Sequence, residues 1–123
     1  MLNYLLVFIG GGFGSIFRYG IAHSMSRYAF TFPYATLVAN IVSCIILGAL
    51  LAWSMQGKTT DIHKFLIMTG FCGGFSTFST FTGETFQLLQ NGEHFLALMN
   101  VLGSIVVCLI CFYLGFRLAQ GLA

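Results

Sequence analysis

The sequence predicts an all-α membrane protein with four transmembrane helices, and three observations lead to that prediction. Hydrophobic residues make up 58% of the 123-residue chain, whereas charged residues make up only 7%. A water-soluble domain carries roughly 25% charged residues, because its surface must face water. The net charge of +2 is too small for a nucleic-acid-binding surface. Soluble enzymes, nucleic-acid-binding proteins and disordered segments are therefore poor fits to this chain.

Four apolar stretches, each near or above the roughly 20 residues that cross a bilayer as a helix, follow one another in the chain. They cover residues 4–22, 34–55, 65–89 and 95–116, within one transmembrane domain of residues 1–123. No Lys or Arg precedes the first stretch, which favours a retained helix over a cleaved signal peptide. The alternating ten-residue segments of β-barrel strands are absent from the sequence.

The basic residues barely decide the orientation of the four predicted spans. Lys58, Lys64 and Arg117 fall on the side of the two termini, and Arg27 falls on the other side, joined by Arg18 where it reaches the interface. This bias is weak by the positive-inside rule. Insertion in both orientations would permit an antiparallel dimer with its two-fold axis in the membrane plane. A single, weakly specified orientation with the termini inside fits the charge counts equally well.

The cysteines and glycines of the spans are predicted to serve packing. The cysteines lack a histidine or a second pair at the spacing of a zinc site, so we interpret them as small apolar residues. Gly10 and Gly14, and likewise Gly70 and Gly74, have the spacing that lets helices approach closely. The four cysteines, all within predicted spans, are Cys44, Cys72, Cys108 and Cys111.

Each of the first three spans contains a strongly polar residue that the membrane would normally exclude. Arg18 lies near the end of the first span, where it either extends to the interface or is held by polar groups in a dimer. Asn40 follows Thr36 in the second span, and its amide either joins two helices or offers two donors to an anion. Glu84 is the only acidic residue within a span, which indicates a water-filled vestibule, a proton relay or a structural pairing.

The third span has the densest polar signal. Gly73 and Gly74 precede alternating hydroxyl residues, a combination that favours a helix break around residues 73–77. Such a break exposes main-chain carbonyls that are able to coordinate a small cation. The alternative is that the hydroxyls bond back to their own helix. The hydroxyl residues are Ser76, Thr77, Ser79, Thr80 and Thr82.

Aromatic and polar residues share helix faces in the third and fourth spans. Phe78 and Phe81 are three residues apart, and the edges of their rings are able to face an anion without a full charge. Asn100 and Ser104 lie one turn apart in the fourth span, on a face that continues to Cys108. That face either lines a path or packs against another helix.

Three motifs together resemble the Fluc-type (CrcB-type) fluoride channels over essentially the whole chain. They are the run GGFSTFSTF at residues 73–81 with Glu84 after it, the glycines at 10–12 with Arg18, and TLVAN at residues 36–40. The resemblance implies an antiparallel, dual-topology homodimer in the lipid bilayer of the cell inner membrane. It implies two pores through which fluoride leaves the cytoplasm passively, which reduces fluoride toxicity.

The resemblance also implies roles for individual residues. A structural sodium ion at the dimer centre would be bound by the main-chain carbonyls of Gly73 and Ser76. Arg18 and Thr36 would be structural polar residues. The fourth span is less polar here than is common in the family, because Cys108 and Phe112 lie along it. The residues expected to line the fluoride pore are Asn40, Phe78, Phe81, Ser79, Thr80, Glu84 and Ser104.

Two other functions of small membrane proteins fit the sequence less well than a fluoride channel does. A small multidrug-resistance-type proton antiporter is also a compact four-span protein. Proteins of that type, however, share an essential glutamate in the first span. Here the first span carries Arg18, and the acid is Glu84 in the third. A non-transporting membrane subunit would need no polar track. We expect no enzymatic activity, because no pairing of a nucleophile with a base is evident.

Overall fold

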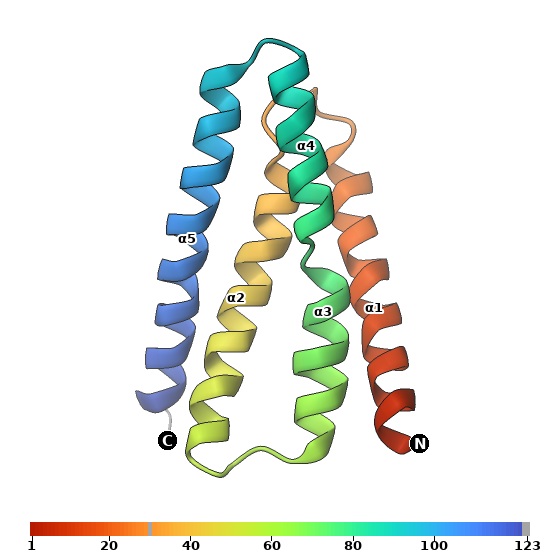
Figure 1. Ribbon diagram of the computed structural model, residues 1–123. Helices are drawn as coiled ribbons and strands as arrows, with labels where there is room; N and C mark the ends of the chain where they lie inside the picture. Colours follow the sequence, from red (N-terminus) through yellow and green to blue (C-terminus); the bar gives the residue numbers. More distant parts are fainter. Residues whose placement is uncertain (30, 122–123) are drawn as a thin grey trace.

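The computed structural model describes residues 1–29 and 31–121, and all regular structure in this part of the chain is helical. The long helices stand side by side in an elongated bundle (Figure 1). The N-terminus, residues 56–62 and the end of the last helix lie at one end of that bundle (Figure 1). The elements are α1 (Leu2–Met25), α2 (Tyr34–Met55), the π-helical η1 (His63–Phe71), α3 (Cys72–Phe75), α4 (Phe78–Gln90) and α5 (His94–Gly121).

Three of these helices, α1, α2 and α5, are long and apolar enough to cross a membrane. The predicted span 34–55 coincides with α2, whereas α1 and α5 extend a few residues beyond the predicted spans at 4–22 and 95–116. Helical hydrogen bonds form between main-chain groups and do not require apolar side chains. A helix is therefore able to continue beyond the apolar stretch from which its span was predicted. The predicted span 65–89 is built from η1, α3 and α4 in succession. That the chain crosses the bilayer four times stays a prediction.

Helix α1 packs against η1 and α3 through glycine, as the spacing of the glycines predicts. A Cβ atom on Gly10, Gly14 or Gly74 would collide with a main-chain oxygen of the neighbouring helix. A Cβ atom on Gly70 would lie 3.0 Å from the Val7 carbonyl oxygen. These contacts confirm the role of the glycines in close helix packing.

Helices α2 and α5 form the second closely packed pair. A Cβ on Gly48 would collide with the carbonyl oxygen of Phe112, and one on Gly115 with that of Ile45. The buried apolar side chains of this pair are mostly small, and include Ala39, Ala52, Ala97 and Ala119, whereas Leu50 on α2 is a larger one. Small side chains bring the two backbones together, so polar groups on α2 and α5 are held at a fixed separation.

The outer faces of the bundle are apolar and exposed. On α1, Phe8 is 77% and Ile16 67% exposed, and on α5 both Leu109 and Leu118 are 66% exposed. A soluble monomer rarely presents continuous apolar surface of this kind. These faces are suited to lipid or to another protein chain.

Candidate functional site

The site is built around two extended residues between α3 and α4. Helix α3 ends at Phe75, Ser76 has a ψ angle of 155°, and Thr77 has φ and ψ angles of −153° and 126°. The Thr77 hydroxyl then accepts a hydrogen bond of 3.2 Å from the Thr80 N–H and so caps the first turn of α4. Gly73 and Gly74, which the sequence places within the predicted break, are still helical.

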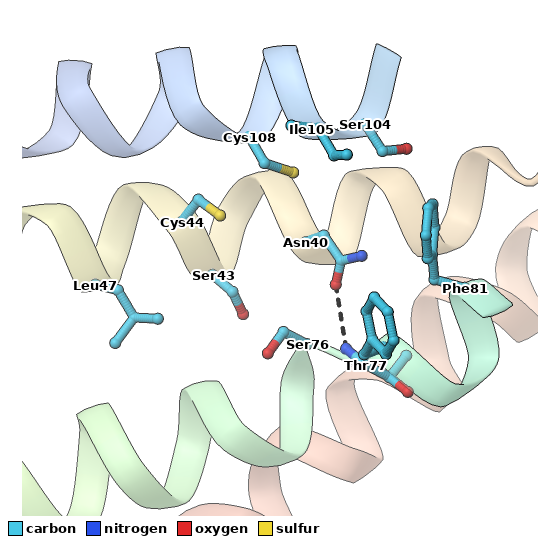
Figure 2. Close-up of a pocket in the computed structure, with 11 residues that line it drawn as sticks. Asn40, Ser43, Cys44, Leu47, Ser76, Thr77, Phe81, Ser104, Ile105 and Cys108 are labelled. Carbon is cyan, nitrogen blue, oxygen red and sulfur yellow. Dashed lines mark hydrogen bonds between the residues drawn. The ribbon is translucent and has the colours of Figure 1, made fainter. Parts of the chain in front are cut away.

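Other helices satisfy the main-chain groups that this interruption frees. The Arg18 Nε on α1 donates to the carbonyl oxygen of Gly74 over 3.2 Å. The Thr77 N–H donates to the Asn40 Oδ1 on α2 over 3.1 Å (Figure 2). A cation is favourable at a helix C-terminus, where carbonyls lack helical partners. Within the single chain Arg18 is therefore held by a main-chain carbonyl, and its contacts in a dimer stay a prediction.

The bond from Thr77 orients the Asn40 amide. With Oδ1 committed to the main chain, the Nδ2 group points toward the side where Phe81 lies (Figure 2). Within the described residues, this Nδ2 group makes no hydrogen bond. Asn40 therefore joins α2 to the α3–α4 junction, and its N–H donors are left unpaired in the part of the chain that the structure describes. That these donors face an anion stays a prediction.

A first cavity of about 290 Å³ lies between α2, the α3–α4 junction and α5. Asn40 from α2, Phe78 and Phe81 from α4, and Ser104 from α5 all line it. The two phenylalanine rings have centroids 5.8 Å apart. Phe81 is half-buried, whereas Phe78 is 79% exposed. The structure thus brings together the amide, both rings and three of the hydroxyl residues that the sequence singled out, namely Ser76, Thr77 and Ser104.

Ser43 is a lining residue that the sequence analysis missed. It is only 1% exposed and belongs to the first cavity. Among the described residues, its buried hydroxyl oxygen has no hydrogen-bond partner. Its position three residues after Asn40 places both on one face of α2, and this spacing was the available signal.

The hydroxyls along α4 mostly bond within their own segment. The Thr77 hydroxyl oxygen lies 3.2 Å from those of both Ser79 and Thr80. Neither Ser79 nor Thr80 lines the first cavity. Thr82 and Thr85 donate to carbonyls one turn earlier, over 2.9 Å and 2.8 Å. The alternative in which these hydroxyls bond back to their own helix therefore describes most of them.

Glu84 lies in a different place from the phenylalanine pair. Its Oε1 accepts a hydrogen bond of 2.6 Å from the Thr36 hydroxyl, a pairing that the sequence did not predict. Its Oε2 is buried and has no partner in the described part of the chain. Glu84 borders a second cavity of about 440 Å³, together with Pro33, Gln87 and Asn91. The predicted pore residues are therefore divided between two cavities.

A chain of hydrogen bonds joins α5 to α4. The Ser104 hydroxyl donates to the Asn100 Oδ1 over 3.3 Å, and the Asn100 Nδ2 donates to the Thr85 hydroxyl over 2.8 Å. Asn100 is 1% exposed, so these bonds satisfy both ends of a buried amide. Thr85 lies along α4 between Phe81 of the first cavity and Gln87 of the second.

The main chain near Gly73 offers oxygen atoms. Gly73 is exposed, and the Thr77 N–H, the usual helical partner of its carbonyl, is bonded to Asn40 instead. The Ser76 hydroxyl donates to the Cys72 carbonyl over 2.6 Å. In residues 1–29 and 31–121, no group of three or more His, Cys, Asp or Glu side chains is placed to hold a metal ion. Any cation here would have to rely on main-chain oxygens.

The family described as "CrcB-like protein, Camphor Resistance (CrcB)" matches residues 5–116. The "Fluoride-specific ion channel FluC" of Pyrococcus abyssi is 44% identical over 117 residues, which cover 94% of each chain. The protein of the same name from Methanocaldococcus jannaschii is 45% identical over 115 residues, 94% of this chain and 92% of that one. That of Klebsiella pneumoniae is 44% identical over 121 residues, 93% and 94% of the two chains. Its apolar helices and these relatives identify the chain as a membrane protein that belongs to the CrcB-like family.

Proposed function

We propose that the protein is a fluoride-selective ion channel, not an enzyme, and that it lets fluoride leave the cytoplasm passively. The observation that supports this most is the first cavity, where the free Nδ2 group of Asn40 faces the side of Phe81. Fluoride is small and strongly hydrated, so a pore must replace its water with close donors. Neutral donors and ring edges do so without holding the anion too tightly to conduct it. Relatives named as fluoride-specific channels support the same function.

The proposed path runs along α4. Fluoride passes Asn40 and Phe81 in the first cavity, then Ser104 and the neighbouring Asn100–Thr85 bond. It reaches the second cavity, which Glu84 borders. Ser79 and Thr80 lie at the start of α4 beside Thr77, and their hydroxyls would supply donors near a vestibule outside the first cavity.

The proposed working unit is an antiparallel homodimer in the cell inner membrane. Phe78 lines the first cavity yet is 79% exposed, so one wall of that cavity is open in a single chain. The accessible surface of 7840 Å² also exceeds the roughly 6,500 Å² expected for a compact monomer of this mass. A second copy would cover Phe78. The weak bias in basic residues permits it to insert in the opposite orientation.

A structural sodium ion would fit at the two-fold axis of this dimer. The Gly73 carbonyl lacks its usual helical donor, and hard cations prefer oxygen ligands of this kind. Gly73 and Ser76 of one chain supply too few oxygens to enclose an ion. Their counterparts in an antiparallel copy would complete the ligand set. The ion would fix the two chains against each other where both helices are interrupted.

The function is tested by fluoride efflux from proteoliposomes, followed with a fluoride electrode and repeated with chloride. We expect rapid release of fluoride but not of chloride, without an imposed proton gradient. Phe78→Ile removes a ring edge from the first cavity and should abolish fluoride efflux while the dimer still assembles. Phe86→Ile is the matched control on the same helix, because Phe86 is 58% exposed and does not line the first cavity. Normal efflux through the Phe78→Ile variant would contradict the pore assignment.

One observation keeps a proton-coupled antiporter as the second candidate. The Glu84 Oε2 is buried and unpartnered among the described residues, and it lies beside the second cavity. A carboxyl group in this setting is able to carry a proton. Fluoride release that requires an imposed proton gradient would favour the antiporter over the channel.

A further inference from the structure

Two thiols lie on the wall of the first cavity. Cys44 reaches it from α2 and Cys108 from α5 (Figure 2), and both are free and half-buried. Cys44 follows Asn40 by four residues, and Cys108 follows Ser104 by four residues. Residues four apart share a helix face. The thiols therefore continue the two helix faces that carry Asn40 and Ser104.

Cys44 and Cys108 face the same space from the two packed helices α2 and α5 (Figure 2). The packing of α2 against α5 explains why. One turn beyond Cys44 is Gly48, which lies against the carbonyl of Phe112, one turn beyond Cys108. The missing side chain of glycine lets the two backbones approach at this level. The separation of the thiols is thus set by packing on the adjacent turn.

A pair of thiolates selects a particular class of ligand. Within the described residues no third His, Cys, Asp or Glu completes a metal-binding group, so a tetrahedral zinc site does not form here. Soft cations prefer thiolate sulfur. Among them, Hg(II) accepts two thiolates in a linear arrangement. It also gives an uncharged complex, which an apolar setting tolerates better than a charged one.

We propose that Cys44 and Cys108 form a two-thiolate site for a soft cation of the Hg(II) class, and that occupancy blocks the first cavity. Binding breaks two S–H bonds, releases two protons to water and forms two metal–sulfur bonds, with no electron transfer. From HgCl₂, two chloride ions leave. The bound ion lies one helical turn from Asn40 and Ser104, in the same cavity that fluoride is proposed to enter. Only the blocking effect rests on the proposed channel function.

Binding is measured on the full chain in detergent with HgCl₂, in an excess of 2-mercaptoethanol that removes singly bound metal. The readouts are near-UV thiolate-to-mercury absorption and the metal content after gel filtration. We expect one Hg(II) per chain. Either Cys44→Ser or Cys108→Ser should weaken binding at least about 100-fold, because the second thiol of a chelate acts at high effective concentration. Cys44→Ala and Cys108→Ala repeat the test with a second side chain.

Cys72→Ser and Cys111→Ser are the matched controls, because neither Cys72 nor Cys111 lines the first cavity. Both should keep the binding of the unchanged chain. Elution at the dimer position in gel filtration establishes that each variant is folded. Binding that survives the loss of Cys44 or Cys108 would overturn the proposed site, and so would binding that depends equally on Cys111.

Fluoride efflux from proteoliposomes tests the block separately. HgCl₂ should stop efflux through the unchanged chain, and a dithiol should restore it. Cys44→Ser and Cys108→Ser should each keep their own untreated rate in HgCl₂. Stoichiometric binding in a protein that shows no fluoride efflux would support the thiol site and refute the channel. Tight binding with unchanged fluoride efflux would refute the block.

Discussion

The two cavities along α4 lie at opposite ends of that helix. The first lies at the N-terminal end, with Phe78, Phe81 and the Asn40 amide. The second lies at the C-terminal end, with Glu84 and Asn91. A helix N-terminus carries a partial positive charge and its C-terminus a partial negative one. The first cavity therefore favours an anion, whereas the second, which also contains a carboxyl group, does not.

This difference suits the two cavities to different steps of fluoride transport. The first is lined largely by apolar atoms, so a few oriented donors there act in a low dielectric and interact strongly with an anion. The second is larger and has a higher proportion of polar groups, so water screens the charges around it. We propose that the first cavity selects fluoride and that the second conducts it in hydrated form.

The largest expected effect comes from Asn40→Asp. The new side chain keeps an oxygen for the Thr77 N–H but replaces the amide donors with a negative charge. Repulsion between two unit charges 4 Å apart is about 4 kcal/mol at an effective dielectric of 20, so fluoride efflux should fall roughly a thousandfold. The measurement is fluoride-electrode efflux from proteoliposomes.

Asn91→Asp is the matched control, because it makes the same chemical change in the second cavity. There the charge faces water, so we expect efflux to change by less than about fivefold, the equivalent of ~1 kcal/mol in water. An equal loss of fluoride efflux in the Asn40→Asp and Asn91→Asp variants would contradict the proposal that only the first cavity selects fluoride.

A smaller effect is expected for Ser43→Ala. The Ser43 hydroxyl is buried without a partner among the described residues, so its removal should leave the free energy of unfolding unchanged or slightly higher. Loss of one donor from the first cavity should slow efflux roughly two- to tenfold, as expected for one hydrogen bond of 0.5–1.5 kcal/mol. The measurements are chemical denaturation in detergent and fluoride efflux.

Ser104→Ala supplies the contrast, because the Ser104 hydroxyl donates to Asn100 over 3.3 Å. Its loss should lower the free energy of unfolding by about 1 kcal/mol. A Ser43→Ala variant as destabilised as Ser104→Ala would mean that the Ser43 hydroxyl has a structural partner in the assembled protein.

The parts of this site that the sequence predicts are those set within one segment. The spacing of Phe78 and Phe81 fixes their shared face, and the glycines of α1 fix where η1 and α3 approach. The poor helix propensity of residues 73–77 points to the place where α3 gives way to α4, although the glycines themselves stay helical. Hydropathy predicts the first and last residues of α2 correctly.

Contacts between distant segments could not be predicted from the sequence in the same way. The Thr36–Glu84 bond joins residues 48 positions apart, and Cys44 and Cys108 line one cavity from two different helices. Such pairs depend on the axial register of one helix against another, which close packing at glycine sets. Rotating or sliding a helix by one residue would part them without any change in hydropathy. The periodicity of the sequence therefore predicts which residues share a face of a helix, but it does not predict which other helix packs against that face.

The smallest effect is expected for Glu84→Gln in the second cavity. Glutamine keeps an oxygen to accept the 2.6 Å bond from Thr36, so the packing of α4 against α2 should persist. Only the ionisable group is lost, and its buried Oε2 belongs to the second cavity and not to the one that Asn40 and Phe81 line. Fluoride efflux without a proton gradient should change by less than about threefold, because Glu84 does not line the cavity proposed to select fluoride. Abolished efflux in this variant, with the Asn91→Asp control still active, would instead assign Glu84 an essential charge or proton, and with it a direct part in transport.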